Sequence, residues 1–284
     1  MLEKSITQIV KLALKEDDAL HDITSDLTIK ENAEIKFVIA ARQNLVFCGQ
    51  GIILEVFEQL RKSKKFINTN LELCFHFNDG DFVKSKKAII TGCGNAKLIL
   101  AGERVILNLI QHLSAIATKT AEIIKLLSNK KIAILDTRKT LPNLRVLQKY
   151  AHKVGGGTNH RFNLSDAILI KDNHIASCGS IRNAFLACKK SKKKVEIECD
   201  NFAQVKEAAA LKPDAIMLDN MSINEIKKCA ALIRKINPNI LIEVSGGISA
   251  ENINKYSELD INFISIGAIT HSVVANDIGL DIVK

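Results

Sequence analysis

Six short apolar runs alternate with helical segments in the second half of the chain, and this alternation constrains the fold more than any other feature. The apolar runs span residues 132–135, 167–170, 195–197, 215–218, 240–244 and 263–266. Helical periodicity fills the intervals between the later runs, over Ile181–Cys188, Phe202–Leu211 and Ile223–Ile236. Strands joined through helices are parallel, because each helix returns the chain to the edge at which the previous strand began. The sequence therefore predicts a parallel α/β fold.

The length of this region indicates what kind of parallel fold it forms. A helical pattern that begins at Glu103 leads into the alternation, so we place the α/β domain at residues 104–271. This segment has 168 residues, whereas a complete eightfold barrel typically has about 250. We therefore expect an open or incomplete parallel α/β barrel.

Residues 1–103 have a different pattern, which mixes helices with antiparallel strands. Helical periodicity covers 6–14 and 51–60, and strand patterns cover 35–40 and 45–48. A hairpin is expected between residues 71–77 and a strand from Phe82 onward, around the turn sequence at 78–81. No cluster of reactive groups occurs here. We therefore predict an N-terminal α+β scaffold domain, residues 1–103, to which the C-terminal residues 272–284 return.

Chemically active residues follow every apolar run of the second half. They are Asp136-Thr137-Arg138, Lys171, Glu198, Asp219-Asn220, Ser245-Gly246-Gly247 and Gly267. The carboxyl ends of parallel barrel strands converge on one face, where active sites of such barrels lie. The sequence therefore predicts an active site at this face.

Five basic residues near these strand ends come from three separate turns of the chain. They are Arg138 and Lys139, His160 and Arg161, and Lys171. Any one of them taken alone could be a solvated loop residue. Together they predict a socket for a small, multiply anionic molecule, because arginine binds carboxylates and phosphates through two parallel hydrogen bonds. A triple glycine at 155–157 precedes His160 and allows close approach of the backbone.

Two acidic residues and two glycine turns complete the predicted site. Glu198 and Asp219 each follow an apolar run, where a carboxylate either pairs with a cation or binds a metal ion. Ser245-Gly246-Gly247 and Gly267, with His271 after it, could be plain strand-to-helix turns. Two such turns after the last two strands favour a phosphate cradle, in which backbone N–H groups and the following helix face the phosphate.

Composition and charge argue against other classes of function. The net charge of +9 comes from two segments: residues 136–174 have four more positive than negative charges, and residues 189–194 contain five lysines. The positive and negative charges of the remaining residues balance. The chain has no tryptophan and 5% aromatic residues, so platforms for stacking nucleic-acid bases are scarce. We therefore expect no nucleic-acid partner.

The absence of a signal pattern, and of any apolar run long enough to span a bilayer, predicts no membrane association. Seven cysteines without metal-ligand spacing are expected to be reduced packing residues of a cytoplasmic protein.

Several motifs in this order carry a resemblance to a known family. The central stretch reads D-T-R-K-T-x-P-x-L-R, then K-Y-A-x-x-x-G-G-G-x-N-H-R, then L-x-D-x-x-L-I-K-D-N-H. Around it lie E-R-V-x-L-N at 103–108, M-L-D-N at 217–220, S-G-G-I at 245–248 and S-I-G-A-I-T-H-S at 265–272. Over nearly the whole chain, this set resembles the quinolinate phosphoribosyltransferases, also called carboxylating nicotinate-nucleotide pyrophosphorylases.

The resemblance implies a reaction and assigns roles to residues. The reaction is phosphoribosyl transfer from phosphoribosyl pyrophosphate to quinolinate with decarboxylation, which gives nicotinate mononucleotide, pyrophosphate and CO2 for NAD biosynthesis. The residues implied to bind quinolinate are Arg104, Thr137, Arg138, Lys139, His160, Arg161 and Lys171. The residues implied to bind the phosphoribosyl group are Glu198, Asp219, Ser245, Gly246, Gly247, Gly267 and His271. Catalysis would depend on Lys139, Lys171, Glu198 and Asp219, of which the last two would lie near Mg²⁺, directly or through water.

The resemblance also implies an assembly. Arg104 would enter the pocket of a partner subunit, so the protein would be a homodimer with shared active sites, or a hexamer built as a trimer of dimers. The nearest alternative in substrate is a related family connected with molybdenum transport, which shares the fold and the phosphate motifs. A non-catalytic phosphosugar sensor and a basic nucleic-acid-binding protein are alternatives from other classes. The complete set of acids and cations argues against the sensor, and the localised charge argues against the nucleic-acid binder.

Overall fold

Two units make up the chain in the computed structural model, which describes residues 2–283. The first unit contains the residues up to Ala121, Thr140–Gly156 and the residues from Ser272 onward. The second contains Glu122–Lys139 and Gly157–His271. The division differs from the expected boundary at residue 104, because helix α4 (Ala96–Leu126) passes that position without a break. The short helix α5 (Arg145–Val154) also belongs to the first unit, although in the sequence it stands between two strands of the second unit.

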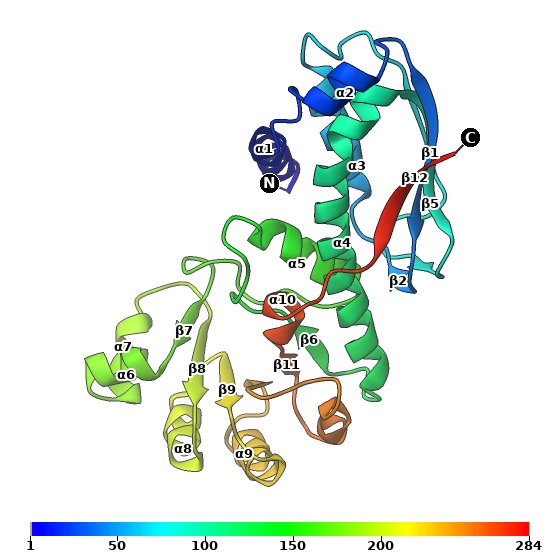
Figure 1. Ribbon diagram of the computed structural model, residues 1–284. Coiled ribbons are helices and arrows are strands. Elements are labelled where there is room, and N and C mark those ends of the chain that lie inside the picture. Colours follow the sequence, from blue (N-terminus) through cyan, green and yellow to red (C-terminus); the bar gives the residue numbers. More distant parts are fainter. Residues whose placement is uncertain (1, 284) are drawn as a thin grey trace. The chain divides into compact units, whose positions relative to one another are not determined.

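The first unit is built on an antiparallel sheet of four strands in the order β12-β1-β5-β3. Figure 1 shows helices α3 and α4 on the same side of this sheet. On β1, Phe37, Ile39 and Ala41 are buried at alternate positions, as expected for a strand with one face in a core. Besides α4 and α5, the elements of this unit are α1 (Leu2–Glu16), α2 (Ile23–Thr28), β1 (Glu34–Ala41), β2 (Leu45–Val46), α3 (Gln50–Arg61), β3 (Leu71–Phe75), β4 (Phe82–Val83), β5 (Ala88–Asn95) and β12 (Ile278–Val283).

The expected hairpin between β3 and β4 does not form, and that prediction was wrong. Strand β3 pairs with β5, whereas β4 pairs with β2. The turn between them bonds to another part of the chain: a carboxylate oxygen of Asp79 accepts the backbone N–H groups of Gly49 and Gln50 at 2.7 and 2.9 Å. The N–H of Gly80 donates to the carbonyl of Phe47 at 2.9 Å. These bonds hold the turn beside residues 47–50, so that β4 pairs with β2 and β3 pairs with β5 in the main sheet.

Helix α4 corrects a second expectation, that no segment is apolar and long enough to cross a membrane. Its length and composition meet that criterion, and it is the one described helix that does so. Most of its apolar stretch is buried inside the fold, where Leu98, Ile106, Ile110 and Ile116 are fully covered. The helix therefore supplies apolar side chains to the protein core.

The second unit is a sheet of six parallel strands in the order β6-β11-β10-β9-β8-β7. The first strand along the chain, β6, pairs with the last, β11, and the sheet stays open between β6 and β7. This confirms the predicted open parallel barrel with an N-terminal α+β part. The elements are β6 (Ala133–Leu135), β7 (Ile168–Ile170), α6 (Asp172–Cys178), α7 (Ile181–Cys188), β8 (Val195–Cys199), α8 (Phe202–Leu211), β9 (Ala215–Asp219), α9 (Ile223–Ile236), β10 (Leu241–Ser245), η1 (Ile253–Tyr256), β11 (Phe263–Ser265) and α10 (Ala268–His271).

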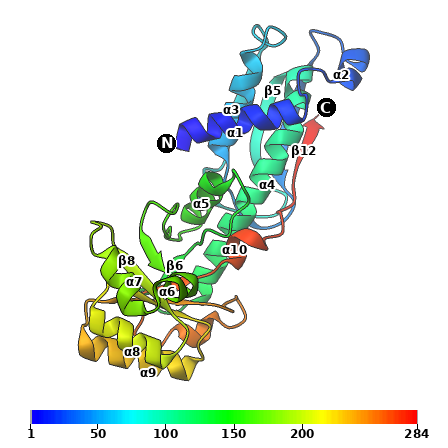
Figure 2. The ribbon, with the colours of Figure 1, turned by 90° about the vertical axis from the view of Figure 1, so that its left-hand side faces the viewer.

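Local sequence signals explain why these elements begin where they do. Helices α7, α8 and α9 follow Ser180, Asn201 and Ser222, whose side chains accept a backbone N–H from the first helical turn. Helices α8 and α9 lie side by side along the outer side of the sheet (Figure 2). The crossover helices therefore cover the outside of the barrel, and the carboxyl ends of its strands remain available for function.

The cysteines only partly match the expectation that they are packing residues. All seven are free thiols, and three of them, Cys48, Cys199 and Cys229, are buried. The other four are exposed or half-buried. Most of the cysteines therefore do not belong to the core, and that part of the expectation was wrong.

Candidate active site

A cavity of about 590 Å³ lies where the six parallel strands end, within the size range of small-molecule sites. Each strand supplies at least one residue to the wall of the cavity, either from the carboxyl end of the strand or from the loop that follows. All lining residues belong to the second unit. Those predicted from the sequence are Thr137, Arg138, Lys139, His160, Arg161, Lys171, Glu198, Asp219, Ser245, Gly246, Gly247, Gly267 and His271.

The segment after β6 is held in place by hydrogen bonds from two directions. The carboxylate of Asp136 is fully buried and accepts the backbone N–H of His160 at 2.8 Å. The hydroxyl of Thr270 donates to the carbonyl of Lys139 at 2.7 Å, and the N–H of Lys139 donates to the Thr137 hydroxyl at 3.0 Å. These bonds fix the main chain from which Arg138 and Lys139 enter the cavity.

Positive charge is concentrated on this side of the cavity. The guanidinium of Arg161 donates from Nη1 to the carbonyl of Ala167 at 3.1 Å, which orients its fork. Burial lowers the pKa of Arg161, and the nearby positive charge of Arg138 lowers it further. An anionic ligand would offset both the loss of solvation and the repulsion between the two guanidinium groups. This side of the cavity therefore favours an anion.

The two carboxylates face the same cavity from β8 and β9. Lys171 Nζ forms a hydrogen-bonded ion pair with Glu198 Oε2. Burial raises the pKa of Glu198, although the bond to Lys171 opposes this effect. Asp219 Oδ2 accepts a hydrogen bond from the Asn220 side chain at 2.6 Å. Two carboxylates with free lone pairs in one polar cavity fit a divalent cation that prefers oxygen ligands, such as Mg²⁺.

The glycine turn after β10 requires its glycines. Gly246 and Gly247 have φ values of +93° and +61°, which disfavour other residues. A Cβ atom at Gly246 would lie 2.2 Å from Asn220 Oδ1, so a side chain there would collide with the end of β9. The segment that follows forms the short 310 helix η1 and not an α-helix, which corrects the expected helix start at this turn. Only Gly267 directly precedes an α-helix, α10.

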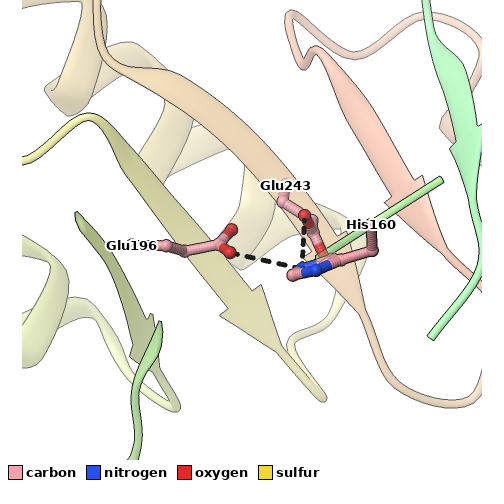
Figure 3. Close-up of side chains that lie close together, drawn as sticks. All are labelled: His160, Glu196 and Glu243. Carbon is pink, nitrogen blue, oxygen red and sulfur yellow. Dashed lines mark ion pairs between the residues drawn. The ribbon is translucent and has the colours of Figure 1, made fainter. Parts of the chain in front are cut away.

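Three residues form a cluster that the sequence reasoning did not identify as a unit. His160 Nε2 lies 3.3 Å from Oε2 of Glu196 and 3.5 Å from Oε2 of Glu243, as Figure 3 shows. Glu243 lines the cavity from β10, and Glu196 projects from β8. A signal was available for Glu196, because residues 196 and 198 alternate with buried Ile197 and must project from the same face of β8.

Glu243 should make the stability of the protein depend on pH. Burial raises the pKa of Glu243 well above its usual range, and the negative charge of Glu196 adds to this effect. The folded chain therefore keeps a proton that the unfolded chain loses above a pH of about 4.5, so this residue lowers stability as pH rises toward its folded pKa. Glutamine cannot ionise. We expect Glu243→Gln to raise the free energy of unfolding by about 1 kcal/mol or more at pH 7–8, with a smaller gain near pH 4.5.

Urea unfolding at these pH values tests the expectation, with the exposed Glu258→Gln as the matched control. A gain that is the same at every pH would show that folding does not raise the pKa of Glu243.

Arg104 is the one predicted site residue that does not line the cavity. It lies on α4 with an exposed side chain and belongs to the first unit. Its predicted role in a partner subunit's pocket therefore stays a prediction.

Comparison with known proteins agrees with the motifs along the whole chain. Residues 22–114 match the family model described as the N-terminal domain of quinolinate phosphoribosyl transferase, and residues 116–281 match that of its C-terminal domain. The probable nicotinate-nucleotide pyrophosphorylase (carboxylating) of Methanocaldococcus jannaschii is 41% identical, over 100% of this chain and 99% of that protein. The corresponding protein of Bacillus subtilis is also 41% identical, over 94% of this chain and 90% of its own length.

Solved structures agree with this result. The nicotinate-nucleotide pyrophosphorylase of Francisella tularensis has a TM-score of 0.91 at 39% identity, over 99% of this chain and 97% of that one. The one from Ehrlichia chaffeensis has a TM-score of 0.90 at 42% identity, over 97% of this chain and 98% of that one. Both domain models and these full-length relatives lead to one conclusion: the chain belongs to the quinolinate phosphoribosyltransferase family.

Proposed function

We propose that the cavity at the strand ends carries out the reaction of this family, phosphoribosyl transfer to quinolinate with loss of CO2. The product is nicotinate mononucleotide, and the reaction serves NAD biosynthesis. The observation that carries the assignment is the meeting of a cationic wall, two carboxylates and two glycine turns around one cavity. These are the groups needed for a dianionic acceptor and a phosphorylated sugar donor.

The cationic wall suits quinolinate, a flat pyridine ring with two adjacent carboxylates. Arg138, Lys139, Arg161 and Lys171 would pair with these carboxylates, and the Thr137 hydroxyl would donate a further hydrogen bond. His160 lines the same wall. We also propose that Arg104 of a partner subunit completes it, since the residue is exposed and lies outside the unit that contains the cavity.

The opposite wall suits phosphoribosyl pyrophosphate. Backbone N–H groups in the turn Ser245–Gly247 and at Gly267 would bind the 5′-phosphate, and His271 would add a donor. Glu198 and Asp219 would hold Mg²⁺, directly or through water, near the pyrophosphate and the ribose. The ion, when bound, would neutralise charge on the leaving pyrophosphate.

Charge and position account for the chemistry without a covalent nucleophile. Loss of pyrophosphate leaves positive charge on the ribose ring, as in other glycosyl transfers. The carboxylates of Glu198 and Asp219 would stabilise this charge. The wall of cations would hold the pyridine nitrogen in line for attack at the ribose carbon. The nitrogen becomes positive on attack, and it then stabilises the electron pair that stays on ring carbon C2 when the 2-carboxylate leaves as CO2. C2 takes up a proton from water, which gives nicotinate mononucleotide.

The direct test is incubation of the protein with quinolinate, phosphoribosyl pyrophosphate and Mg²⁺. We expect equal amounts of CO2 and nicotinate mononucleotide, measured by release of labelled carboxyl carbon and by chromatography. Nicotinate in place of quinolinate is the control. Product formation from neither acid, with a folded protein, would contradict the proposed function.

The two carboxylates should affect turnover more than acceptor binding. Glu198→Gln and Asp219→Asn remove a charge while keeping the shape, and we expect each to lower kcat about 100-fold or more. The Kd for quinolinate should change far less than kcat, because both carboxylates would face the ribose and the metal ion, and only Glu198 also contacts a quinolinate-binding residue, Lys171. Steady-state kinetics and calorimetry with quinolinate separate the two quantities. Loss of quinolinate binding with unchanged use of phosphoribosyl pyrophosphate would place these residues in the acceptor site instead.

We further propose a cytoplasmic homodimer with shared active sites, with a trimer of dimers as the alternative assembly. The seven free cysteines and the buried position of α4 support the cytoplasmic placement. The exposed position of Arg104 supports the shared site. Light scattering of the purified protein would distinguish a monomer, a dimer and a hexamer.

A further inference from the structure

The two nitrogen atoms of the His160 imidazole ring face different groups. Nδ1 accepts the backbone N–H of Arg161 at 2.7 Å. Nε2 lies 3.3 Å from the carboxyl group of Glu196 and 3.5 Å from that of Glu243, without hydrogen-bond geometry to either (Figure 3). The exposed fractions of the three side chains are 11% for His160, 13% for Glu196 and 3% for Glu243, so water has little access to the cluster.

The bond at Nδ1 determines where the ring carries its proton. A backbone N–H can only donate, so Nδ1 must offer its lone pair and cannot carry hydrogen. In a doubly protonated ring, the N–H at Nδ1 would face the backbone N–H of Arg161, and two donors would oppose each other. In the neutral ring the single proton is therefore on Nε2, the nitrogen that lies beside the two acidic side chains. A ring in this state carries no charge with which to form an ion pair with a substrate carboxylate.

The cluster is attached to rigid parts of the sheet. Glu196 lies on β8 and Glu243 on β10, and the hydroxyl of Ser265 on β11 donates to Glu243 Oε1. On the other side of the histidine, the buried Asp136 carboxylate accepts its backbone N–H. The main chain at 160–161 is thus bound both by its own histidine ring and by a carboxylate at the end of β6. Groups held in this way on strands position a neighbouring functional side chain accurately.

We propose that Glu196 and Glu243 are positioning residues of this site, which hold the ring of His160 in place so that its unprotonated Nδ1 fixes the main chain that presents Arg161. The proposal rests on the proposed function for the identity of the ligand, but not for the state of the ring. It assigns His160 a role that differs from the one expected from the sequence. His160 adds no positive charge to the wall, and it acts on the substrate through Arg161.

The state of the ring can be measured without substrate. In protein labelled with ¹⁵N-histidine, we expect His160 at neutral pH to show one protonated nitrogen, Nε2, and one unprotonated nitrogen, Nδ1. Comparison with His160→Asn assigns its signals among the seven histidines. Two protonated nitrogens would identify an imidazolium and overturn the proposal, as would a proton on Nδ1. An unprotonated Nε2 would also overturn it, and would indicate a cation held among the three side chains.

Kinetics then tests whether the glutamates act through Arg161. We expect Glu243→Ala to raise the KM for quinolinate by about 10- to 100-fold, because small displacements of a binding group have effects of this size. The KM for phosphoribosyl pyrophosphate should change less than about threefold. Glu243→Gln keeps an acceptor for Ser265 and a polar group beside Nε2, so it should recover most of the loss. The exposed Glu258→Ala is the control for a glutamate outside the cluster.

The outcomes separate this proposal from the proposed function. Equal changes in both KM values, or no recovery in a folded Glu243→Gln, would show that the cluster is merely structural. If Glu243→Ala does not fold, the ring state in the wild-type protein and in Glu243→Gln still decides the proposal. An imidazolium in an active enzyme would contradict the positioning role and leave the reaction assignment intact. A neutral ring with its proton on Nε2, in a protein without activity, would contradict the reaction assignment and leave the inferred state of the ring intact.

Discussion

Nicotinate will bind to this protein at least about 100-fold more weakly than quinolinate. The two acids differ by one carboxylate, and the cavity wall supplies more cationic groups than a single carboxylate can pair with. Cations left unpaired in a partly buried wall cost several kcal/mol in total, and each 1.4 kcal/mol corresponds to about a tenfold change in Kd. Isothermal titration of both acids at the same ionic strength measures the ratio.

A matched pair of variants shows whether the wall produces this discrimination. Arg161→Ala removes one guanidinium from the wall and should bring the two Kd values closer together, mainly by weakening quinolinate. Lys255→Ala removes an exposed positive charge outside the cavity and should leave the ratio unchanged. Similar binding of the two acids to the wild-type protein would contradict a site built for a dianion.

Two inactive variants, Arg104→Ala and Lys171→Ala, will regain activity when they are mixed under conditions that exchange subunits. If Arg104 enters the partner's pocket, each variant alone has a damaged site in every pocket. A mixed dimer instead places both changes in one pocket and leaves the other pocket complete. With random exchange and independent pockets, about a quarter of the wild-type activity should return, because half of the dimers are mixed and half of their pockets are intact.

Controls make the complementation result interpretable. Each variant incubated alone under the same conditions should stay inactive, and native mass spectrometry of isotope-labelled subunits should show that exchange occurred. Mixing Lys171→Ala with Glu198→Gln should give no recovery, since both residues line the same cavity within one chain. Proven exchange without recovery for the Arg104 pair would show that Arg104 serves its own chain or has a structural role.

Much of the second unit could be predicted from the sequence, because its signals are local. Helices α7, α8 and α9 begin and end at the residues that the periodicity predicted. Residues 137–139, 171, 198 and 219 line one cavity, as the sequence predicted, because each stands at the end of an apolar strand, and the carboxyl ends of parallel strands share one face. Neither step requires knowledge of which strands are neighbours.

Only the tertiary structure decided which distant segments pair. The sequence at 71–83 is compatible with a local hairpin, but Asp79 bonds to Gly49 and Gln50, and β4 therefore pairs with β2. In the same way, Glu196 and Glu243 appear in the sequence as single acids within apolar strands. Strands β8 and β10 are separated by β9 in the sheet, and His160 comes from a loop that precedes both. Their meeting depends on strand order and loop path, which residue periodicity does not contain, so the proton position on His160 became apparent only from the folded chain.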